Sequence, residues 1–156
     1  YKDEWARDLY RTHGIVQKRI HGEDREGYDM IGKHWEECFE FIESSVVSNP
    51  KSKVVVHCVA GINRSGLIAC AAYMILEGQN SSGSGGGGGV NVLDAVRHCV
   101  ERRGNILSNQ SFQKQLCCLA AQYDLLGERP EGFSDEPIEE RDIPPPPIRA
   151  LDRMGE

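Results

Sequence analysis

Three features are missing from this sequence, and each absence argues against a class of protein. There is no Cys-x-x-Cys pair, so we expect neither a zinc site nor another metal or cofactor. There is no apolar run long enough to span a bilayer, so we expect no membrane partner. There is also no recognisable secretory signal, although the chain begins at Tyr1 rather than Met. There is no basic excess: the net charge of −6 disfavours nucleic acid, whose partners usually carry a basic face.

The features that are present fit one soluble globular domain. The 156 residues are 39% apolar and 27% charged, which is ordinary for such a domain. Four of the six cysteines lie inside apolar helical patterns, where buried free thiols are expected. Unpaired thiols favour a reducing compartment, so we expect a cytoplasmic protein, with the nucleus as the alternative.

Apolar periodicity divides the chain into a folded part and a tail. We expect one domain over 1–126, interrupted by a Gly/Ser-rich insert at 80–89, and an acidic, Pro-rich tail at 127–156. β-branched runs predict short strands, and apolar residues recurring every three or four positions predict helices. The expected strands are 14–20 and 53–57, and the expected helices are 3–13, 29–47, one from Ser65, 92–103 and one capped by Ser108 or Asn109.

The most informative segment runs from His57 to Ser65, between the second expected strand and the apolar helix. In a strand–loop–helix unit of this kind, backbone N–H groups point at one centre, and the helix N-terminus adds its positive dipole end. Gly61 permits the sharp turn, and the Arg64 guanidinium can donate to two phosphate oxygens. The sequence therefore predicts a phosphate-binding loop, formed by Val59, Ala60, Gly61, Ile62 and Asn63.

Cys58 lies at the start of this loop, where its thiol is expected to be activated. A free cysteine has a pKa near ~8.5, and surroundings of this kind lower it by several units. We therefore expect Cys58 to be a thiolate at neutral pH and to act as a nucleophile. Ser65 is placed to donate a hydrogen bond to that sulfur.

His57, Cys58, Arg64 and Ser65 form the HCx5R(S/T) signature, and the sequence here resembles the protein tyrosine phosphatase superfamily, in its dual-specificity branch. The resemblance covers about residues 14–126. It implies an α/β fold with a central, mostly parallel twisted sheet flanked by helices. It also implies that the family's first strands are missing from this chain, because they would precede Tyr1.

The resemblance further assigns roles to residues outside the loop. The family's general acid is an Asp on an upstream loop, and Asp24 lies 34 residues before Cys58; Glu23 and Asp29 are the alternatives. His57 is expected to orient the loop. Asn109 matches an Asn that braces the loop in the family, although a helix cap explains it almost as well.

The implied reaction is hydrolysis of phosphotyrosine and phosphoserine or phosphothreonine in proteins through a cysteinyl-phosphate, without a metal. No Trp-Pro-Asp occurs, which favours the dual-specificity branch over the tyrosine-specific one. Three alternatives remain open: a phosphoinositide phosphatase, an RNA 5′-triphosphatase and an inactive phosphate-binding module. Uncharged loop positions disfavour the phosphoinositide phosphatase, and the acidic net charge disfavours the RNA 5′-triphosphatase. The intact Cys, Arg and Asp disfavour the inactive module. We expect PPPP at 144–147 to be a stiff tail, with binding to an SH3- or WW-type domain as the alternative.

Overall fold

The computed structural model describes residues 2–49, 51–81 and 90–128, and the described chain contains five helices. They are α1 (Lys2–Thr12), α2 (Met30–Ser48), α3 (Arg64–Ser81), α4 (Val92–Arg103) and α5 (Gln110–Gln122). Most of the expected insert and nearly all of the expected tail, including its proline run, lie outside the described residues.

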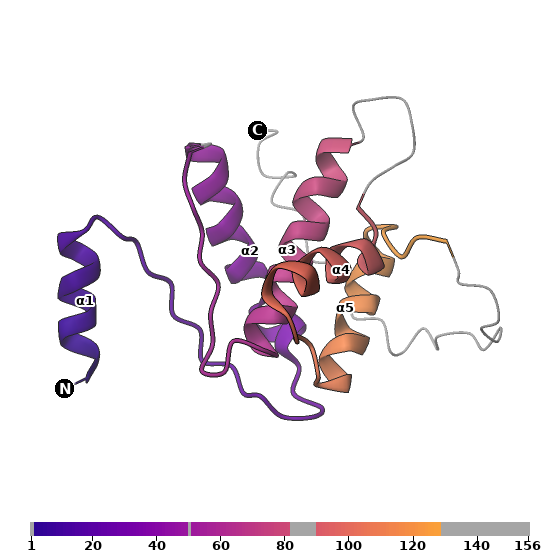
Figure 1. Cartoon of the computed structure of the whole chain (residues 1–156), viewed down its shortest axis with the longest axis horizontal. Helices are drawn as coiled ribbons and strands as arrows, with labels where there is room; N and C mark the ends of the chain where they lie inside the picture. The colour runs from indigo at the N-terminus through magenta and orange to yellow at the C-terminus, as the bar shows by residue number, and fades with distance from the viewer. Residues whose placement is uncertain (1, 50, 82–89, 129–156) are drawn as a thin grey trace, which may run out of the picture.

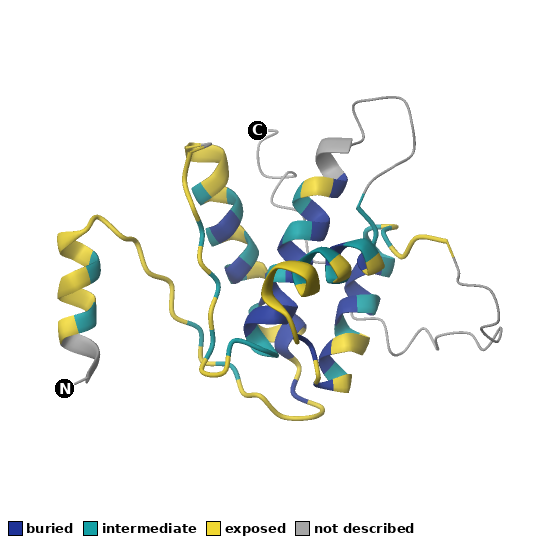
Figure 2. Ribbon diagram, viewed as in Figure 1, coloured by how far each residue is buried: buried dark blue, intermediate teal, exposed yellow. Residues whose placement is uncertain are grey.

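Helix α3 is the centre of the arrangement. It packs against α2, α4 and α5, whereas α1 stands apart from this group (Figure 1). Buried residues gather where the four packed helices face one another (Figure 2). The apolar composition of α3 explains its position, because a helix that is hydrophobic on nearly all sides must be covered on nearly all sides. Its fully buried side chains are Leu67, Cys70, Ala71, Met74 and Ile75.

Helix α2 covers α3 with one apolar stripe, as its sequence pattern predicts. Ile31, Trp35, Cys38 and Ile42 are buried, and the rings of Trp35 and Phe39 stack at 4.9 Å between centroids. The predicted helix over 29–47 is thus confirmed to within a residue. Three helices are capped by side chains that accept a hydrogen bond from a backbone N–H group: Asp29 caps α2, Asn91 caps α4 and Asn109 caps α5.

The expected central sheet is the clear error of the sequence-based prediction. Residues 14–20 and 53–57 are not helical, but no strand occurs within the described residues, and no backbone ladder joins either segment to another. In the second segment Val54 and Val56 pack against the core, while Val55 is 82% exposed. β-propensity alone cannot make a strand, because a strand also needs a partner for its N–H and C=O groups. The described fold is therefore helical and not α/β.

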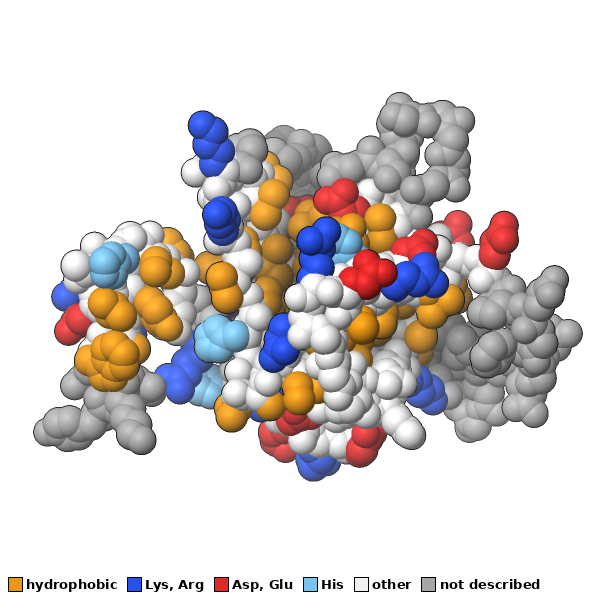
Figure 3. Space-filling model, in the orientation of Figure 1, with side chains coloured by type: hydrophobic (Ala, Val, Ile, Leu, Met, Phe, Trp, Pro, Cys, Tyr) orange, Lys and Arg blue, Asp and Glu red, His pale blue; other side chains and the backbone are white. Residues whose placement is uncertain are grey.

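Charges of both signs are mixed on the surface. On the face drawn in Figure 3, basic, acidic and histidine side chains alternate over short distances. Within residues 2–49, 51–81 and 90–128, none of the helices is both long and apolar enough to cross a membrane.

Phe112 provides a test of this packing, because it is fully buried where α5 meets the core. We expect Phe112→Ala to lower the free energy of unfolding by about 3–5 kcal/mol, through lost burial and the cavity left behind. Urea denaturation followed by circular dichroism measures the loss. Val47→Ala is the matched control, since Val47 is 73% exposed near the end of α2 and should change stability by at most about 0.5 kcal/mol. Equal losses for both variants would contradict the packing.

Candidate active site

The loop that carries Cys58 leads directly into the N-terminus of α3. Gly61 has a φ of +69°, a left-handed conformation that side chains with a Cβ rarely adopt. Two residues later the carbonyl of Asn63 accepts a hydrogen bond from the Leu67 N–H at 2.8 Å, and the helix begins. The phosphate-loop prediction therefore has its turn and its helix, although the expected strand before it has no partner within the described chain.

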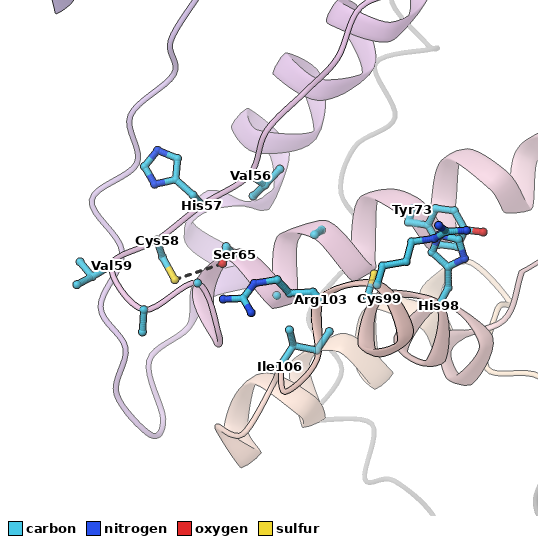
Figure 4. Close-up of a pocket in the computed structure, with 15 residues that line it drawn as sticks. Val56, His57, Cys58, Val59, Ser65, Tyr73, His98, Cys99, Arg103 and Ile106 are labelled. Atoms are coloured by element: carbon cyan, nitrogen blue, oxygen red, sulfur yellow. Dashed lines mark hydrogen bonds between the residues drawn. The ribbon is translucent and has the colours of Figure 1, made fainter. Parts of the chain in front are cut away.

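The Cys58 sulfur lies 3.3 Å from the Ser65 hydroxyl, as the sequence pattern predicts (Figure 4). Burial alone would raise the pKa of Cys58. Hydrogen bonds from the Ser65 hydroxyl and from the backbone N–H groups of Ser65, Gly61 and Ile62 outweigh that effect and lower the pKa to about 7. The shift favours the thiolate form of Cys58 at neutral pH.

Asp24 lies in a polar network that ties three segments of the chain together. Its carboxylate accepts hydrogen bonds from the side-chain amides of Asn63, at 3.1 Å, and of Asn109, at 3.4 Å. The same Asn63 accepts through its Oδ1 from the Ser108 hydroxyl and from the Asn109 N–H, both at 3.0 Å. The loop that carries Asp24, the phosphate loop and the start of α5 are joined here through Asn63.

The bridging role of Asn63 and Ser108 did not follow from the sequence. Asn63 was expected only as part of the loop backbone, and Ser108 only as a helix cap. One signal was present: Asn63 is the only amide among otherwise apolar and glycine residues between Cys58 and Arg64. Its partners, however, lie 39 and 45 residues away in the sequence.

Arg64 faces the Asp24 side of the loop. Its Nη1 donates to the carbonyl oxygen of Gly22 at 3.2 Å, and its Nε lies 3.9 Å from Asp24 Oδ2. That Nε is buried and has no hydrogen-bond partner within the described chain. A buried guanidinium N–H without an acceptor carries a desolvation cost, which an anionic oxygen would relieve.

The two alternative acids are engaged elsewhere. Asp29 accepts the Gly32 N–H at 2.7 Å and caps α2. Glu23 pairs with Arg25 at 3.2 Å on the surface. The side chain of His57 is exposed and makes no hydrogen bond to any described residue, so its orienting role stays a prediction.

A cavity of about 650 Å³ opens beside Cys58, between the loop and helices α3 and α4 (Figure 4). Cys58 and Ser65 line one end, and Tyr73 and His98 line the other. Asp24 and Arg64 do not line this cavity. The structure therefore brings the expected site residues together in two groups, one around the Cys58 sulfur and one around the Asp24 carboxylate.

Two arginines of α4 that line the cavity, Arg102 and Arg103, were not predicted as site residues. A Cβ added to Gly61 would lie 3.0 Å from Arg103 Nη2, so this guanidinium covers the turn of the phosphate loop. In the sequence, Arg102 and Arg103 are basic residues in the last turn of a helix, and the favourable interaction of such residues with the helix dipole is enough to explain their presence. Within the described residues no group of three His, Cys, Asp or Glu side chains could hold a metal ion.

Comparison with known proteins identifies the family of this chain. Residues 2–122 match the family described as dual specificity phosphatase, catalytic domain. The chain belongs to this family. No solved structure gives a significant match.

Three curated relatives illustrate the similarity. Dual specificity protein phosphatase 26 of Homo sapiens is 26% identical over 112 residues, which cover 72% of this chain and 46% of that protein. Dual specificity protein phosphatase 2 of Mus musculus is 37% identical over 92 residues, covering 59% and 25%. Tyrosine-protein phosphatase yvh1 of Schizosaccharomyces pombe is 33% identical over 94 residues, covering 60% and 24%. The chain thus matches less than half of the length of each of these relatives.

The role of Ser65 can be tested on the thiol itself. We expect Ser65→Ala to raise the pKa of Cys58 and to slow its alkylation at pH 6 by about tenfold, because a hydrogen bond to the thiolate is lost. Mass spectrometry of the tryptic peptide 54–64 follows the reaction, since Cys58 is its only cysteine. Ser44→Ala is the control, because the Ser44 hydroxyl donates only to the Phe41 carbonyl on the surface. Unchanged alkylation in Ser65→Ala would contradict the assignment.

Proposed function

We propose that this chain hydrolyses phosphotyrosine and phosphoserine or phosphothreonine in proteins through a cysteinyl-phosphate intermediate. One observation carries the proposal: the Cys58 sulfur is hydrogen-bonded by Ser65 and by three backbone N–H groups, which lower its pKa to about 7. A thiol in that state is a nucleophile at neutral pH, and the donors around it suit an anionic phosphoryl group.

In the first step the Cys58 thiolate attacks phosphorus, and the bond from phosphorus to the seryl, threonyl or tyrosyl oxygen breaks. Asp24 protonates the leaving oxygen. The amide donors of Asn63 and Asn109 hold the Asp24 carboxylate at the edge of the loop. The unpartnered Nε of Arg64 is the donor for a phosphoryl oxygen.

In the second step water attacks the cysteinyl-phosphate, and the sulfur–phosphorus bond breaks. Asp24 now takes a proton from the water, which reverses its first role. The Ser65 hydroxyl stabilises the departing thiolate, at the 3.3 Å separation already present in the free protein. Inorganic phosphate and the regenerated thiolate are the products, and no step uses a metal.

The choice of protein substrates rests on family membership. Relatives named dual specificity or tyrosine phosphatases match the part of the chain that holds the site, although each match covers less than half of that relative. The uncharged side chains of Val59, Ala60, Ile62 and Asn63 offer no extra cation for a polyphosphorylated lipid headgroup. The free cysteines support a reducing location, in the cytoplasm or nucleus.

Hydrolysis of a small aryl phosphate without added metal tests the mechanism. We expect turnover by the unmodified chain, none by Cys58→Ser, and a rate about 10²–10⁴-fold lower for Asp24→Asn. The rate should rise with pH through about 7, because the thiolate is the reactive form and its population grows as pH passes the Cys58 pKa.

Asp29→Asn is the matched control for Asp24→Asn, since Asp29 caps α2 and should not enter the chemistry. Equal background rates for all four proteins would overturn the proposal for this chain. Product analysis on phosphotyrosine and phosphothreonine peptides then separates dual from single specificity.

Asn109 provides a separate test, because it both caps α5 and donates to Asp24. We expect Asn109→Ala to lower the free energy of unfolding by about 1 kcal/mol. Asn109→Ser should keep the cap and most of the stability but lack the amide donor, so its turnover number should fall while its unfolding midpoint stays near that of the parent. Urea denaturation and aryl phosphate kinetics measure the two effects. Full activity in Asn109→Ser would assign Asn109 to capping alone.

A further inference from the structure

A second pair of thiols lies outside the chemistry derived above. Cys70 is on α3 and is completely buried, while Cys99 is on α4 and is partly exposed. The two thiols influence each other electrostatically across the packed helices α3 and α4. A disulfide between them would join two helices that are already packed against each other.

The neighbouring contacts hold the two helices in this register. The rings of Tyr73 and His98 stack at 4.3 Å between centroids with 12° between their planes. Tyr73 lies one turn after Cys70 on α3, and His98 is adjacent to Cys99 on α4. The Tyr73–His98 stack therefore keeps Cys70 beside Cys99.

Cys99 is also reachable from solvent. It lines the same cavity as Cys58, together with Tyr73 and His98 (Figure 4). A small neutral oxidant such as hydrogen peroxide that enters the active-site cavity would therefore meet Cys99 as well as the proposed nucleophile. Cys70 is fully buried on the neighbouring helix α3.

We propose that Cys70 and Cys99 form a peroxide-sensitive thiol pair that is converted to a disulfide across α3 and α4. The Cys99 sulfur attacks one peroxide oxygen, the O–O bond breaks, and Cys99 sulfenic acid and one water result. The Cys70 sulfur then attacks the Cys99 sulfur, the S–O bond breaks, and a second water leaves with the thiol proton. Two thiols lose two electrons and two protons, and one peroxide becomes two waters.

The ionisation of the pair supports this order of events. The hydrogen bond from Cys70 lowers the pKa of Cys99 to about 7, although burial opposes the shift. The same hydrogen bond and burial raise the pKa of Cys70. Because Cys99 lines the cavity and Cys70 is fully buried, Cys99 is the attacking thiol and Cys70 the resolving thiol. Burial raises the pKa of Cys38, in contrast, to about 11, so that thiol should stay inert.

The disulfide would join the two helices that line the cavity beside Cys58. Helix α3 carries Ser65 at its start, and α4 carries Arg103 near its end. Because the bond closes a loop between positions 29 residues apart in the sequence, it restricts the unfolded chain and should raise stability. The oxidised protein would thus have a cross-linked cavity that the reduced protein lacks.

Peptide mapping tests the proposal without depending on phosphatase activity. The chain is treated with hydrogen peroxide, remaining thiols are blocked, and trypsin is added without a reductant. Peptides 65–97 and 98–102 each contain one cysteine, Cys70 and Cys99 respectively, so their linked product identifies the bond. We expect this product in the unmodified chain, in Cys58→Ser and in the control Cys38→Ala, and we expect dithiothreitol to abolish it.

Cys70→Ala and Cys99→Ala should lack the linked product. We also expect peroxide to raise the thermal unfolding midpoint of Cys58→Ser, and we expect no such increase in Cys70→Ala or Cys99→Ala. The formation of sulfinic or sulfonic acid at Cys99, with no linked peptide, would overturn the proposal. A product joining 54–64 to 98–102 would also overturn it, because Cys58 would then be the partner of Cys99. Either result leaves the proposed phosphatase function intact, since that function is judged by the Cys58→Ser and Asp24→Asn assays.

Discussion

The burial of α3 is the constraint on which the rest of this protein depends. Five of its side chains are fully buried, and burial of a large apolar side chain contributes about 1.5–3 kcal/mol. Because α2, α4 and α5 all pack against it, the start of α3 has a defined place in the molecule. Ser65, in its first turn, is itself buried, and its hydroxyl is thereby held 3.3 Å from the Cys58 sulfur. The ionisation of the thiol thus follows from the position of a helix.

The polar network around Asn63 is a second constraint, which fixes the position of Asp24 beside the phosphate loop. Asp24, Ser108 and Asn109 come from distant parts of the chain, and each contacts the Asn63 amide. An amide group offers both donors and an acceptor, so a single side chain can bind a carboxylate on one side and a hydroxyl and an N–H on the other. This arrangement keeps the proposed acid beside the phosphate loop while leaving Arg64 Nε without an acceptor. Binding of an anion would satisfy that donor.

The cysteines show how similar side chains receive different chemistry from their surroundings. Cys58 and Cys99 both have pKa values of about 7, one through Ser65 and loop amides and the other through a neighbouring thiol. Cys38 has only burial and the charge of Glu37 to raise its pKa, against a small opposing effect of Lys18. Sequence patterns placed most of these thiols correctly inside helices, but they did not distinguish an inert thiol from a paired one, because the partner is on another helix.

The sequence by itself determined the helices and predicted a phosphate loop. Apolar spacing, a Ser or Asn at the start of the last helix, and the order of Cys58, Gly61, Arg64 and Ser65 are local signals, and local physics acts on them directly. The tertiary structure alone decided the rest. The β-branched residues of 53–57 predicted a strand of a sheet. A sheet needs a second segment that hydrogen-bonds to the first, and no segment of the described chain does so. The Asn63 bridge, Arg103 above Gly61 and the Cys70–Cys99 contact likewise join residues that only packing brings together.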